Sequence, residues 1–349
     1  MPKGTLVRLS PPPAIAAAVL SLPAGQSTVD EARQAGRIDE ATADRLGYRS
    51  LAQSVDRSAP EMAVLAAGKA LAEAGWTGAE LDLVVHSWIY HQGHDFWSPP
   101  HYVAAQVGAD GTLAVGVQQT SNGVVAAIDL AVTRMAVDPT VSRVLVTTAD
   151  RFCEPGFERW GGDIDVAYGD GATALLLHRA GGGPYRLLSV ASVSVPEYEV
   201  LYRGDDAFSP AARTPYGTVD ARRTKMVFRN GGGWLRFVAV LTRSVQQAVR
   251  GALADAGLAL DDPCVRYVVM PRIGTGAITQ FYGPAVREIG LPHAEVLLLG
   301  RDTGHLGAGD PVANLADLHA GRMLAPGEVG LLLSAGNGYT WSCLAVRRD

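Results

Sequence analysis

Ser121 lies where the chain turns from an apolar, strand-like run into a helix-like run. The stretch from 115 to 132 reads VGVQQTSNGVVAAIDLAV, and Gly123 follows the serine by two residues. A helix start carries unpaired backbone N–H groups and the positive end of the helix dipole, which favour a nucleophile placed there. A glycine beside it lets a neighbouring segment approach closely. The pattern suits a nucleophilic serine, and it also suits a serine that only caps the helix.

A hidden duplication pairs Ser121 with His305. The segment ALAEAG near residue 70 reappears as ALADAG near residue 252, and each copy is followed by an apolar run, LDLVVHS and then VRYVVMP. These runs are offset by 184 residues, and at that offset Ser121 falls on His305, each two residues before a glycine. Helix and strand alternating in two copies predict an α/β fold whose halves pack around a pseudo-twofold axis. Such an axis would bring the two turns together.

His305 and Asp310 have the types and spacing of a base and the acid that orients it. A serine hydroxyl needs an adjacent base to become a nucleophile, and imidazole is the usual one. Asp310 precedes Pro311, which suits a helix cap. Its carboxylate would also suit the group that orients the imidazole and stabilises the imidazolium. The sequence therefore predicts a Ser-His-Asp triad of Ser121, His305 and Asp310.

Further motifs resemble one enzyme family in their order along the chain. They are GYRS, SAPEMAVLAAGKALAEAG, YGDGATALLL and GNGYTWSCLAVR, beginning at Gly47, Ser58, Tyr168 and Gly336. The set is similar to ketoacyl-acyl-carrier-protein synthase III of the thiolase superfamily. QTSNG and TGHLGAGDP are similar to its subfamily in aromatic polyketide and glycoside antibiotic biosynthesis.

The resemblance implies a thiolase-like duplicated five-layer αβαβα fold with pseudo-twofold related halves. Residues 1–180 would form the N-terminal half, which carries the nucleophile. Residues 181–230 would form a connecting strand and insert segment. Residues 231–349 would form the C-terminal half, which carries His305 and Asp310.

The chain departs from the family at its catalytic positions. Ser121 matches the cysteine that takes up the acyl group, His305 matches an asparagine, and Arg272 matches the histidine that assists decarboxylation. The resemblance therefore implies an acyltransferase that moves an acyl group from acyl-coenzyme A or acyl-carrier protein, through an acyl-Ser121 ester, to a carrier protein, hydroxyl or amine. It implies the backbone N–H groups of Ser121 and Asn337 as the oxyanion hole. Coenzyme A or phosphopantetheine thioesters would be substrates, and no separate cofactor is expected.

Two other functions stay open at this point. The chain could retain decarboxylative condensation of a starter acyl group with malonyl-carrier protein, with His305 alone supporting that step. It could instead be a non-catalytic ketosynthase-like subunit that sets the specificity of a partner, since a fold does not fix a function.

The segment HSWIYHQGHDFW, from residue 86 to 97, is rich in histidine and aromatic residues. Its histidine spacing fits no common zinc pattern, so we predict no metal site. Trp88, Phe96 and Trp97 are candidates to line an acyl pocket or a dimer interface. Arg272 is a candidate to hold a substrate carboxylate or phosphate, because its guanidinium is forked and permanently charged. The resemblance implies a homodimer in which the strand after the nucleophile helix pairs across the twofold axis.

Composition argues against several other classes of protein. A net charge of -5 and a charged fraction of 19% give no basic face for nucleic acid. No run reaches the ~18 apolar residues of a membrane span, and the proline-interrupted N-terminal stretch is not expected to be a secretory signal. The cysteines form no CxxC pair, which argues against disulfides and zinc and favours a cytoplasmic location; they are Cys153, Cys264 and Cys343.

Overall fold

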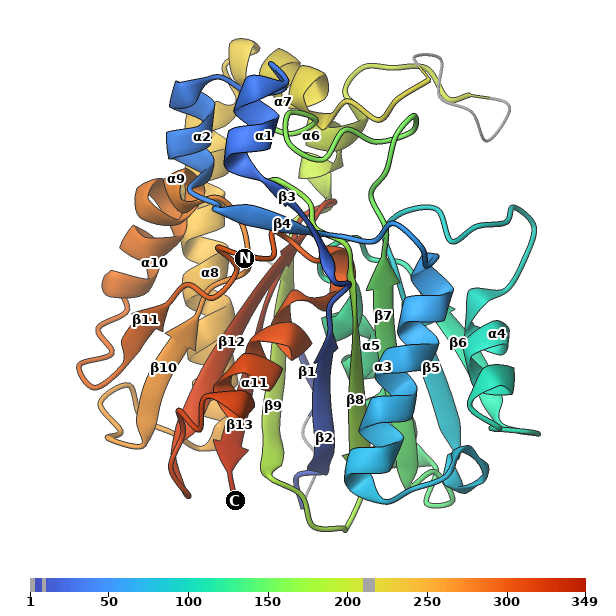
Figure 1. The fold of residues 1–349 in the computed structure, drawn as a ribbon. Coiled ribbons are helices and arrows are strands. Elements are labelled where there is room, and N and C mark those ends of the chain that lie inside the picture. The colour runs from blue at the N-terminus through green and yellow to red at the C-terminus, as the bar shows by residue number, and fades with distance from the viewer. Residues whose placement is uncertain (1–3, 8–10, 210–216) are drawn as a thin grey trace.

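A large β-sheet organises the chain. The computed structural model describes residues 4–7, 11–209 and 217–349 (Figure 1). Ten strands follow the order β11-β10-β12-β13-β9-β2-β8-β7-β5-β6, β1 pairs with β9, and β3 and β4 form a separate pair. The strands are β1 (Gly4–Val7), β2 (Ala14–Ser21), β3 (Gly25–Thr28), β4 (Ser50–Gln53), β5 (Leu83–Ser87), β6 (Leu113–Val117), β7 (Arg143–Asp150), β8 (Gly171–His178), β9 (Tyr185–Ser194), β10 (Val265–Val269), β11 (Glu295–Leu297), β12 (Val329–Gly336) and β13 (Thr340–Arg348).

Helices alternate with these strands in both halves. The α-helices are α1 (Val29–Gln34), α2 (Glu40–Leu46), α3 (Ala59–Ala74), α4 (Pro99–Gln106), α5 (Gly123–Val137), α6 (Val200–Arg203), α7 (Ala221–Asn230), α8 (Trp234–Ala256), α9 (Thr275–Ala277), α10 (Gly283–Arg287) and α11 (Asp310–Ala320). Short turns of other helical types are η1 (Gly78–Glu80), η2 (Pro196–Glu199), η3 (Ile278–Tyr282) and η4 (Gly307–Gly309). In the described part of the chain, no helix is long and apolar enough to cross a membrane.

The two halves repeat one strand order around a central junction. Outward from the centre, the first half runs β2, β8, β7, β5, β6 and the second runs β9, β13, β12, β10, β11. The halves meet where β2 pairs with β9, through Ala14 with Arg186 and Ile15 with Tyr185. The duplicated architecture predicted from the repeat is therefore confirmed.

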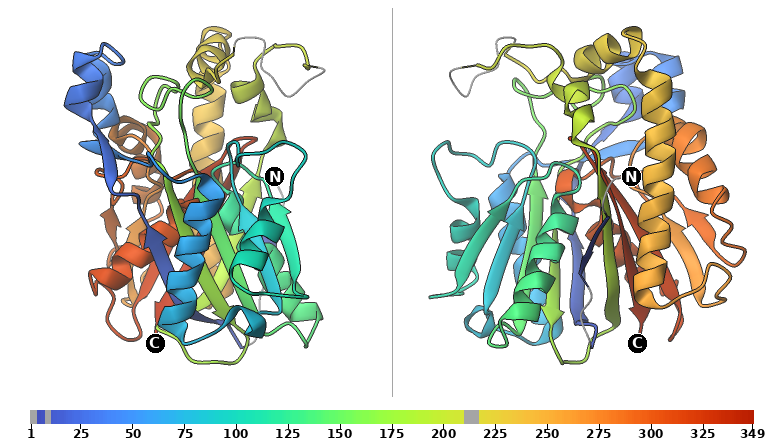
Figure 2. Two further views of the ribbon diagram at one scale, coloured as in Figure 1. Left: turned by 45° about the vertical axis from the view of Figure 1, so that its right-hand side comes forward. Right: turned by 180° about the vertical axis from the view of Figure 1, so that it is seen from behind.

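Three apolar clusters sort the helices into layers. One cluster packs α3 and α4 against first-half strands, and another packs α8 and α10 against second-half strands. A third cluster contains α5 and α11 together with strand residues of both halves. The layers thus run helix, sheet, helix, sheet, helix, as predicted. Figures 1 and 2 show α3 on one side of the sheet and α8 on the other.

The repeated Ala-Gly endings of α3 and α8 are helix stops. Gly75 has φ 67° after α3, and Gly257 has φ 73° after α8. Glycine adopts this left-handed conformation without a Cβ penalty, so it commonly ends helices. Each stop releases the chain into the first core strand of its half, β5 or β10. The repeat seen in the sequence is therefore a helix, a stop and a strand.

Two expectations about boundaries and edges are wrong. β9 lies within residues 181–230, but it pairs with β13 along its length and takes the place that β2 has in the first half. The second half therefore begins at β9, and not at residue 231. The strand after the nucleophile helix is β7, which is bonded to β5 and β8 on its two sides. It has no free edge to pair across a twofold axis, whereas β6 ends the sheet.

Gly169 locks the two halves together beside the predicted site. Its N–H donates to the carbonyl of His305 at 3.0 Å, and the His305 N–H donates to the carbonyl of Ala167 at 3.0 Å. A Cβ at position 169 would lie 1.8 Å from the carbonyl oxygen of Thr303. Only glycine allows the two backbones to approach this closely.

We expect Gly169→Ala to lower the free energy of unfolding by about 2 kcal/mol, because backbone atoms must shift to admit the methyl group. Gly182→Ala is the matched control, since no atom lies within 4 Å of a Cβ added there. It should change stability by less than about 0.5 kcal/mol. Urea unfolding followed by circular dichroism measures both variants. Equal stability of the two would contradict the proposed close approach.

Candidate active site

Ser121 lies in a strained turn between β6 and α5. Thr120 has φ 46°, a left-handed value that residues other than glycine rarely adopt. The N–H of Gly123 donates to the Thr120 carbonyl at 2.9 Å, which closes the turn. The N-cap of α5 is Asn122, and the Ser121 hydroxyl contacts His305 instead. Reading Ser121 as the helix cap is therefore wrong.

The start of α5 also lies close to two other segments. A Cβ at position 123 would lie 2.1 Å from Ser87 Oγ and 3.1 Å from the Cβ of Ala308. The first residue of α5 thus passes between the end of β5 and the η4 turn of the other half. This close approach brings the Ser121 turn up to the loop that carries His305.

A continuous hydrogen-bond relay joins the predicted trio. Ser121 Oγ lies 2.7 Å from His305 Nε2, and His305 Nδ1 lies 2.7 Å from Asp310 Oδ2. His305 and Asp310 are 3% and 1% exposed. The Asp310 carboxylate accepts a hydrogen bond from the Nδ1–H group of His305, which leaves the lone pair of Nε2 to receive the Ser121 hydroxyl proton. The structure therefore brings together the three residues of the predicted triad.

Asp310 is held as a carboxylate although it is buried. Burial alone raises the pKa of Asp310, but the charges of His305 and Arg272 and several hydrogen bonds outweigh burial and lower it below its ordinary value. The N–H groups of Leu306 and Arg272 donate to Asp310 at 2.9 and 2.7 Å. A fixed anion beside Nδ1 favours the imidazolium that forms when His305 takes a proton.

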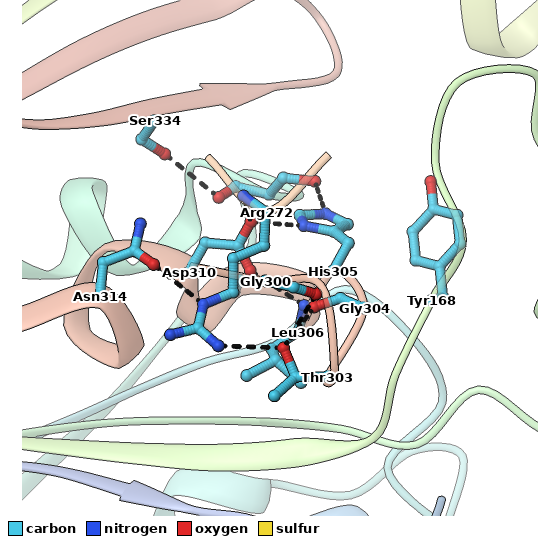
Figure 3. Close-up of polar contacts among 12 residues, drawn as sticks. Tyr168, Arg272, Gly300, Thr303, Gly304, His305, Leu306, Asp310, Asn314 and Ser334 are labelled. Atoms are coloured by element: carbon cyan, nitrogen blue, oxygen red, sulfur yellow. Dashed lines mark hydrogen bonds and ion pairs between the residues drawn. The ribbon is translucent and has the colours of Figure 1, made fainter. Parts of the chain in front are cut away.

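Arg272 does not serve as the predicted substrate contact. Its side chain is fully buried and ion-paired with Asp317. Its Nε and Nη1 donate to Asn314 and Thr303, each at 2.9 Å. Figure 3 shows Arg272, Asp310 and Asn314 on one side of His305 and Tyr168 on the other. The guanidinium donors are thus used inside the protein, and the backbone N–H of Arg272 supports Asp310.

The predicted aromatic pocket residues lie elsewhere. Phe96 is fully exposed and Trp97 is 38% exposed, in the loop between β5 and α4. Trp88 stacks on His86, with ring centroids 5.5 Å apart. None of the three lines the cavity at Ser121. Phe96 and Trp97 point to solvent in this loop, so the prediction that the aromatic residues line an acyl pocket at Ser121 is wrong.

The cavity beside Ser121 has a volume of about 90 Å³ and a largely aromatic wall. Asn337, the second predicted oxyanion donor, lines it from the turn between β12 and β13. The Thr120 hydroxyl donates to the Asn337 carbonyl at 3.3 Å, which ties this turn to the nucleophile turn. The other lining residues are Ser121, Asp165, Val166, Tyr168, Leu201, Tyr202, Lys225, Trp234, Phe237, Leu241, Ile273, Ala277, Phe281, Tyr282, His305, Ala335, Gly336 and Tyr339.

Sequence reasoning missed most of this wall. Three of its members, Leu201, Tyr202 and Lys225, come from residues 181–230, which the sequence predicted as a connecting strand and insert segment, and three more come from the start of α8. Tyr168 carried a usable signal, because it directly precedes the Gly-Asp-Gly motif. A much larger groove, of about 670 Å³, lies between β6 and α5 and does not include Ser121. Within the described residues, no cluster of three or more His, Cys, Asp or Glu side chains could hold a metal ion.

Asp150 is a buried carboxyl that ties the η4 turn to the loop after β5. Its Oδ1 accepts from the N–H groups of Ile89 and Tyr90 at 2.9 and 2.8 Å. Its Oδ2 accepts from the N–H of Ala308 at 3.2 Å. Burial raises the pKa of Asp150 to about 7, although these hydrogen bonds oppose the rise.

We expect Asp150→Asn to flatten the pH dependence of stability between about pH 4 and 7. Since the folded pKa is about 7 and the unfolded value ~3.9, the folded protein binds more protons in this window. The wild type therefore loses stability as pH rises through it, by up to roughly 3 kcal/mol. Urea unfolding from pH 4.5 to 8 measures this, with exposed Asp110→Asn as the control. Parallel curves for wild type and Asp150→Asn would refute the assignment.

Known proteins resemble this chain along its whole length. Residues 253–348 match the family described as 3-oxoacyl-[acyl-carrier-protein (ACP)] synthase III C terminal. A β-ketoacyl-[acyl-carrier-protein] synthase III from Rhizorhabdus wittichii is 25% identical, with 92% of this chain and 94% of the relative aligned. A 3-oxoacyl-[acyl-carrier-protein] synthase III from Aquifex aeolicus VF5 has the same fold, with a TM-score of 0.76, 21% identity and coverage of 96% and 99%.

A closer structural likeness is to ChlB3, which is described as an acyltransferase. It is 30% identical, has a TM-score of 0.88, and aligns with 97% of this chain over 98% of its own. This likeness and the C-terminal family match extend the agreement from the fold to the sequence. The chain therefore belongs to the family of ketosynthase III-like enzymes within the thiolase superfamily.

Proposed function

We propose that this protein is an acyltransferase that carries its acyl group on Ser121. The acyl group would come from acyl-coenzyme A or an acyl-carrier protein and pass to a carrier protein, hydroxyl or amine. The observation that carries the proposal is the Ser121–His305–Asp310 relay, with 2.7 Å at each step, which opens on a cavity of its own. The resemblance to the antibiotic subfamily suggests a place in secondary-metabolite biosynthesis.

Each step of a two-stage transfer can be given to a described group. His305 Nε2 takes the proton of Ser121 as its oxygen attacks the thioester carbonyl, and Asp310 stabilises the imidazolium. The C–S bond then breaks, and His305 protonates the leaving thiolate. The acceptor loses its proton to His305 as it attacks the acyl-serine ester, and Ser121 recovers its proton.

The oxyanion would form between two turns of the chain. We assign its stabilisation to the backbone N–H groups of Ser121 and Asn337, both of which belong to residues lining the cavity. One such donor typically contributes about 3 kcal/mol to transition-state stabilisation. The tie between Thr120 and Asn337 would keep the two turns at a fixed separation.

A serine in place of the family's cysteine fits the change from asparagine to His305. A thiol forms its anion readily, whereas a hydroxyl needs a base in contact with it. The contact between Ser121 and His305 meets that need. The change from cysteine to Ser121 and the change from asparagine to His305 therefore fit together, because the second supplies the base that the first requires.

Arg272 supports transfer over decarboxylative condensation. It stands where the resemblance puts the histidine that assists decarboxylation, but its donors are engaged by Asn314, Thr303 and Asp317. It also does not line the cavity. The likeness to ChlB3, described as an acyltransferase, points the same way.

Intact-mass spectrometry tests the proposal directly. After exposure to a panel of acyl-coenzyme A thioesters, the wild type should gain the mass of one acyl group, and Ser121→Ala should gain none. Ser121→Cys should still be acylated, because His305 can also take the proton of a thiol. His305→Ala should slow acylation by at least about 10³-fold. A panel that never acylates the wild type would favour a non-catalytic subunit, and carbon dioxide release from malonyl-carrier protein would favour condensation.

We also propose that the chain forms a homodimer through β6, since β7 has no free edge. β6 ends the sheet, and the apolar groove beside it is lined from both β6 and α5. Leu113 and Val137 in this groove are 56% and 73% exposed. A second copy would cover these side chains and extend the sheet.

Val115→Arg, inside the groove, should convert a dimer into a monomer, because it would bury a charge at the interface. Val55→Arg is the control, as Val55 is 74% exposed and lies outside the groove. Light scattering during size-exclusion chromatography gives the mass of each variant. A wild type that is already monomeric at micromolar concentration would rule out this dimer.

A further inference from the structure

A buried ion pair lies in the wall of the Ser121 cavity. Lys225, on α7, lines the cavity and pairs with Asp163, and their side chains are 9% and 0% exposed. The Asp163 carboxylate also accepts from the hydroxyls of Tyr168 and Tyr202 at 3.0 and 3.4 Å. The Lys225 ammonium lies 4.4 Å from the centroid of the Tyr202 ring. Neither charge takes part in the relay proposed above.

Tyr168 connects this ion pair to the relay. Its ring packs edge-on against His305, with centroids 5.3 Å apart, and its hydroxyl reaches Asp163. One side chain thus spans from the imidazole to the ion pair. An acyl group on Ser121 would extend along Tyr168 toward Lys225, since all of these residues line one cavity.

The wall of the cavity offers both a hydrogen-bond donor and an acceptor. An ammonium group has three N–H donors, and the bond to Asp163 engages one of them. Asp165 lines the same cavity. Burial raises the pKa of Asp165, and the positive charge of Lys225 is the strongest of the nearby charges that oppose this rise. An alkyl chain would leave the remaining hydrogen-bonding capacity of Lys225 and Asp165 unused in a cavity from which it has displaced water, which is costly.

Charge and size narrow the choice of acyl group. Lys225 is neutralised by Asp163, and Asp165 lies 4.0 Å from Arg45. A carboxylate on the acyl group would therefore add a third negative charge beside Asp163 and Asp165, whose charges already balance those of Lys225 and Arg45. The volume of about 90 Å³ is below the ~150 Å³ of a cavity known to hold benzene. A cavity of this size suits a short acyl group better than a long one.

We propose that the cavity selects a small, neutral acyl group that carries a hydroxyl, which accepts a hydrogen bond from Lys225 and donates one to Asp165. This inference rests on the proposed acyl-Ser121 function and names its substrate class. The aromatic wall would pack against the carbon skeleton. The two polar side chains would then distinguish a hydroxyacyl group from its deoxy counterpart.

Binding to Ser121→Ala tests the selection separately from the chemistry. Isothermal titration calorimetry would compare lactyl- with propionyl-coenzyme A, and 3-hydroxybutyryl- with butyryl-coenzyme A. The coenzyme A part is common to each pair, so the difference reports on the hydroxyl. We expect at least one hydroxyacyl thioester to bind about tenfold or more tightly than its counterpart, as a hydrogen bond to a charged group allows. Equal binding in both pairs, or tighter binding of octanoyl- or succinyl-coenzyme A, would overturn the proposal.

Variants in the Ser121→Ala background identify the groups responsible. Lys225→Met should abolish the preference, and Lys69→Met, on α3 outside the cavity, should keep it. Asp165→Ala should reduce the preference for the hydroxyacyl thioester several-fold. If Lys225→Met does not fold, the result for Asp165→Ala alone tests the assignment. A preference that survives both cavity variants would overturn the assignment.

The acylation of wild-type Ser121 by the same thioesters is read separately. If Ser121 is acylated but binding shows no preference for the hydroxyacyl thioester, the proposed acyltransferase function holds and the proposed hydroxyacyl substrate class is refuted. A binding preference without acylation would contradict the proposed function alone.

Discussion

The close approach of two glycine-rich segments to the turns that carry Ser121 and His305 holds the site together. Gly169 and Ala167, from the first half, bond the backbone of His305 in the second half. In the opposite direction, Gly336 of the second half lies so close to the Ser121 turn that a Cβ there would be 2.6 Å from the Asn122 nitrogen. Each half therefore supports the turn that carries Ser121 or His305 in the other half. The separation of Ser121 and His305 follows from these backbone contacts more than from either side chain.

The pairing of Ser121 with His305 could be predicted because it follows from symmetry. A constant offset between two copies places equivalent turns at one axis, whatever side chains they carry. Asp310 followed from its position just before Pro311, at the start of α11. The same logic failed at the domain boundary, because β9 has little sequence likeness to β2 although it occupies the equivalent place in the sheet.

Side-chain destinations away from the axis could not be predicted in this way. The role of Arg272 depends on Asn314 and Asp317, which lie one turn apart on α11 and face it only after the halves have packed. Between the first strand of each half and its long helix, the first half forms β3, α1, α2 and β4 where the second forms α6 and α7, so the repeat gave no guide to Lys225. The exposed aromatic Phe96 was misleading for a related reason, because composition does not reveal which way a loop leaves the sheet.

The half-sheets join through two residue pairs between β2 and β9 and four between β1 and β9. The central helices and the turns that meet around Ser121 add further contacts between the halves. Any opening that separates the halves would pull the imidazole away from the hydroxyl. The contacts that place Ser121 beside His305 are also contacts that couple the unfolding of the two halves. A partially unfolded form that keeps only one half intact would therefore lack the Ser121–His305 pair and be inactive.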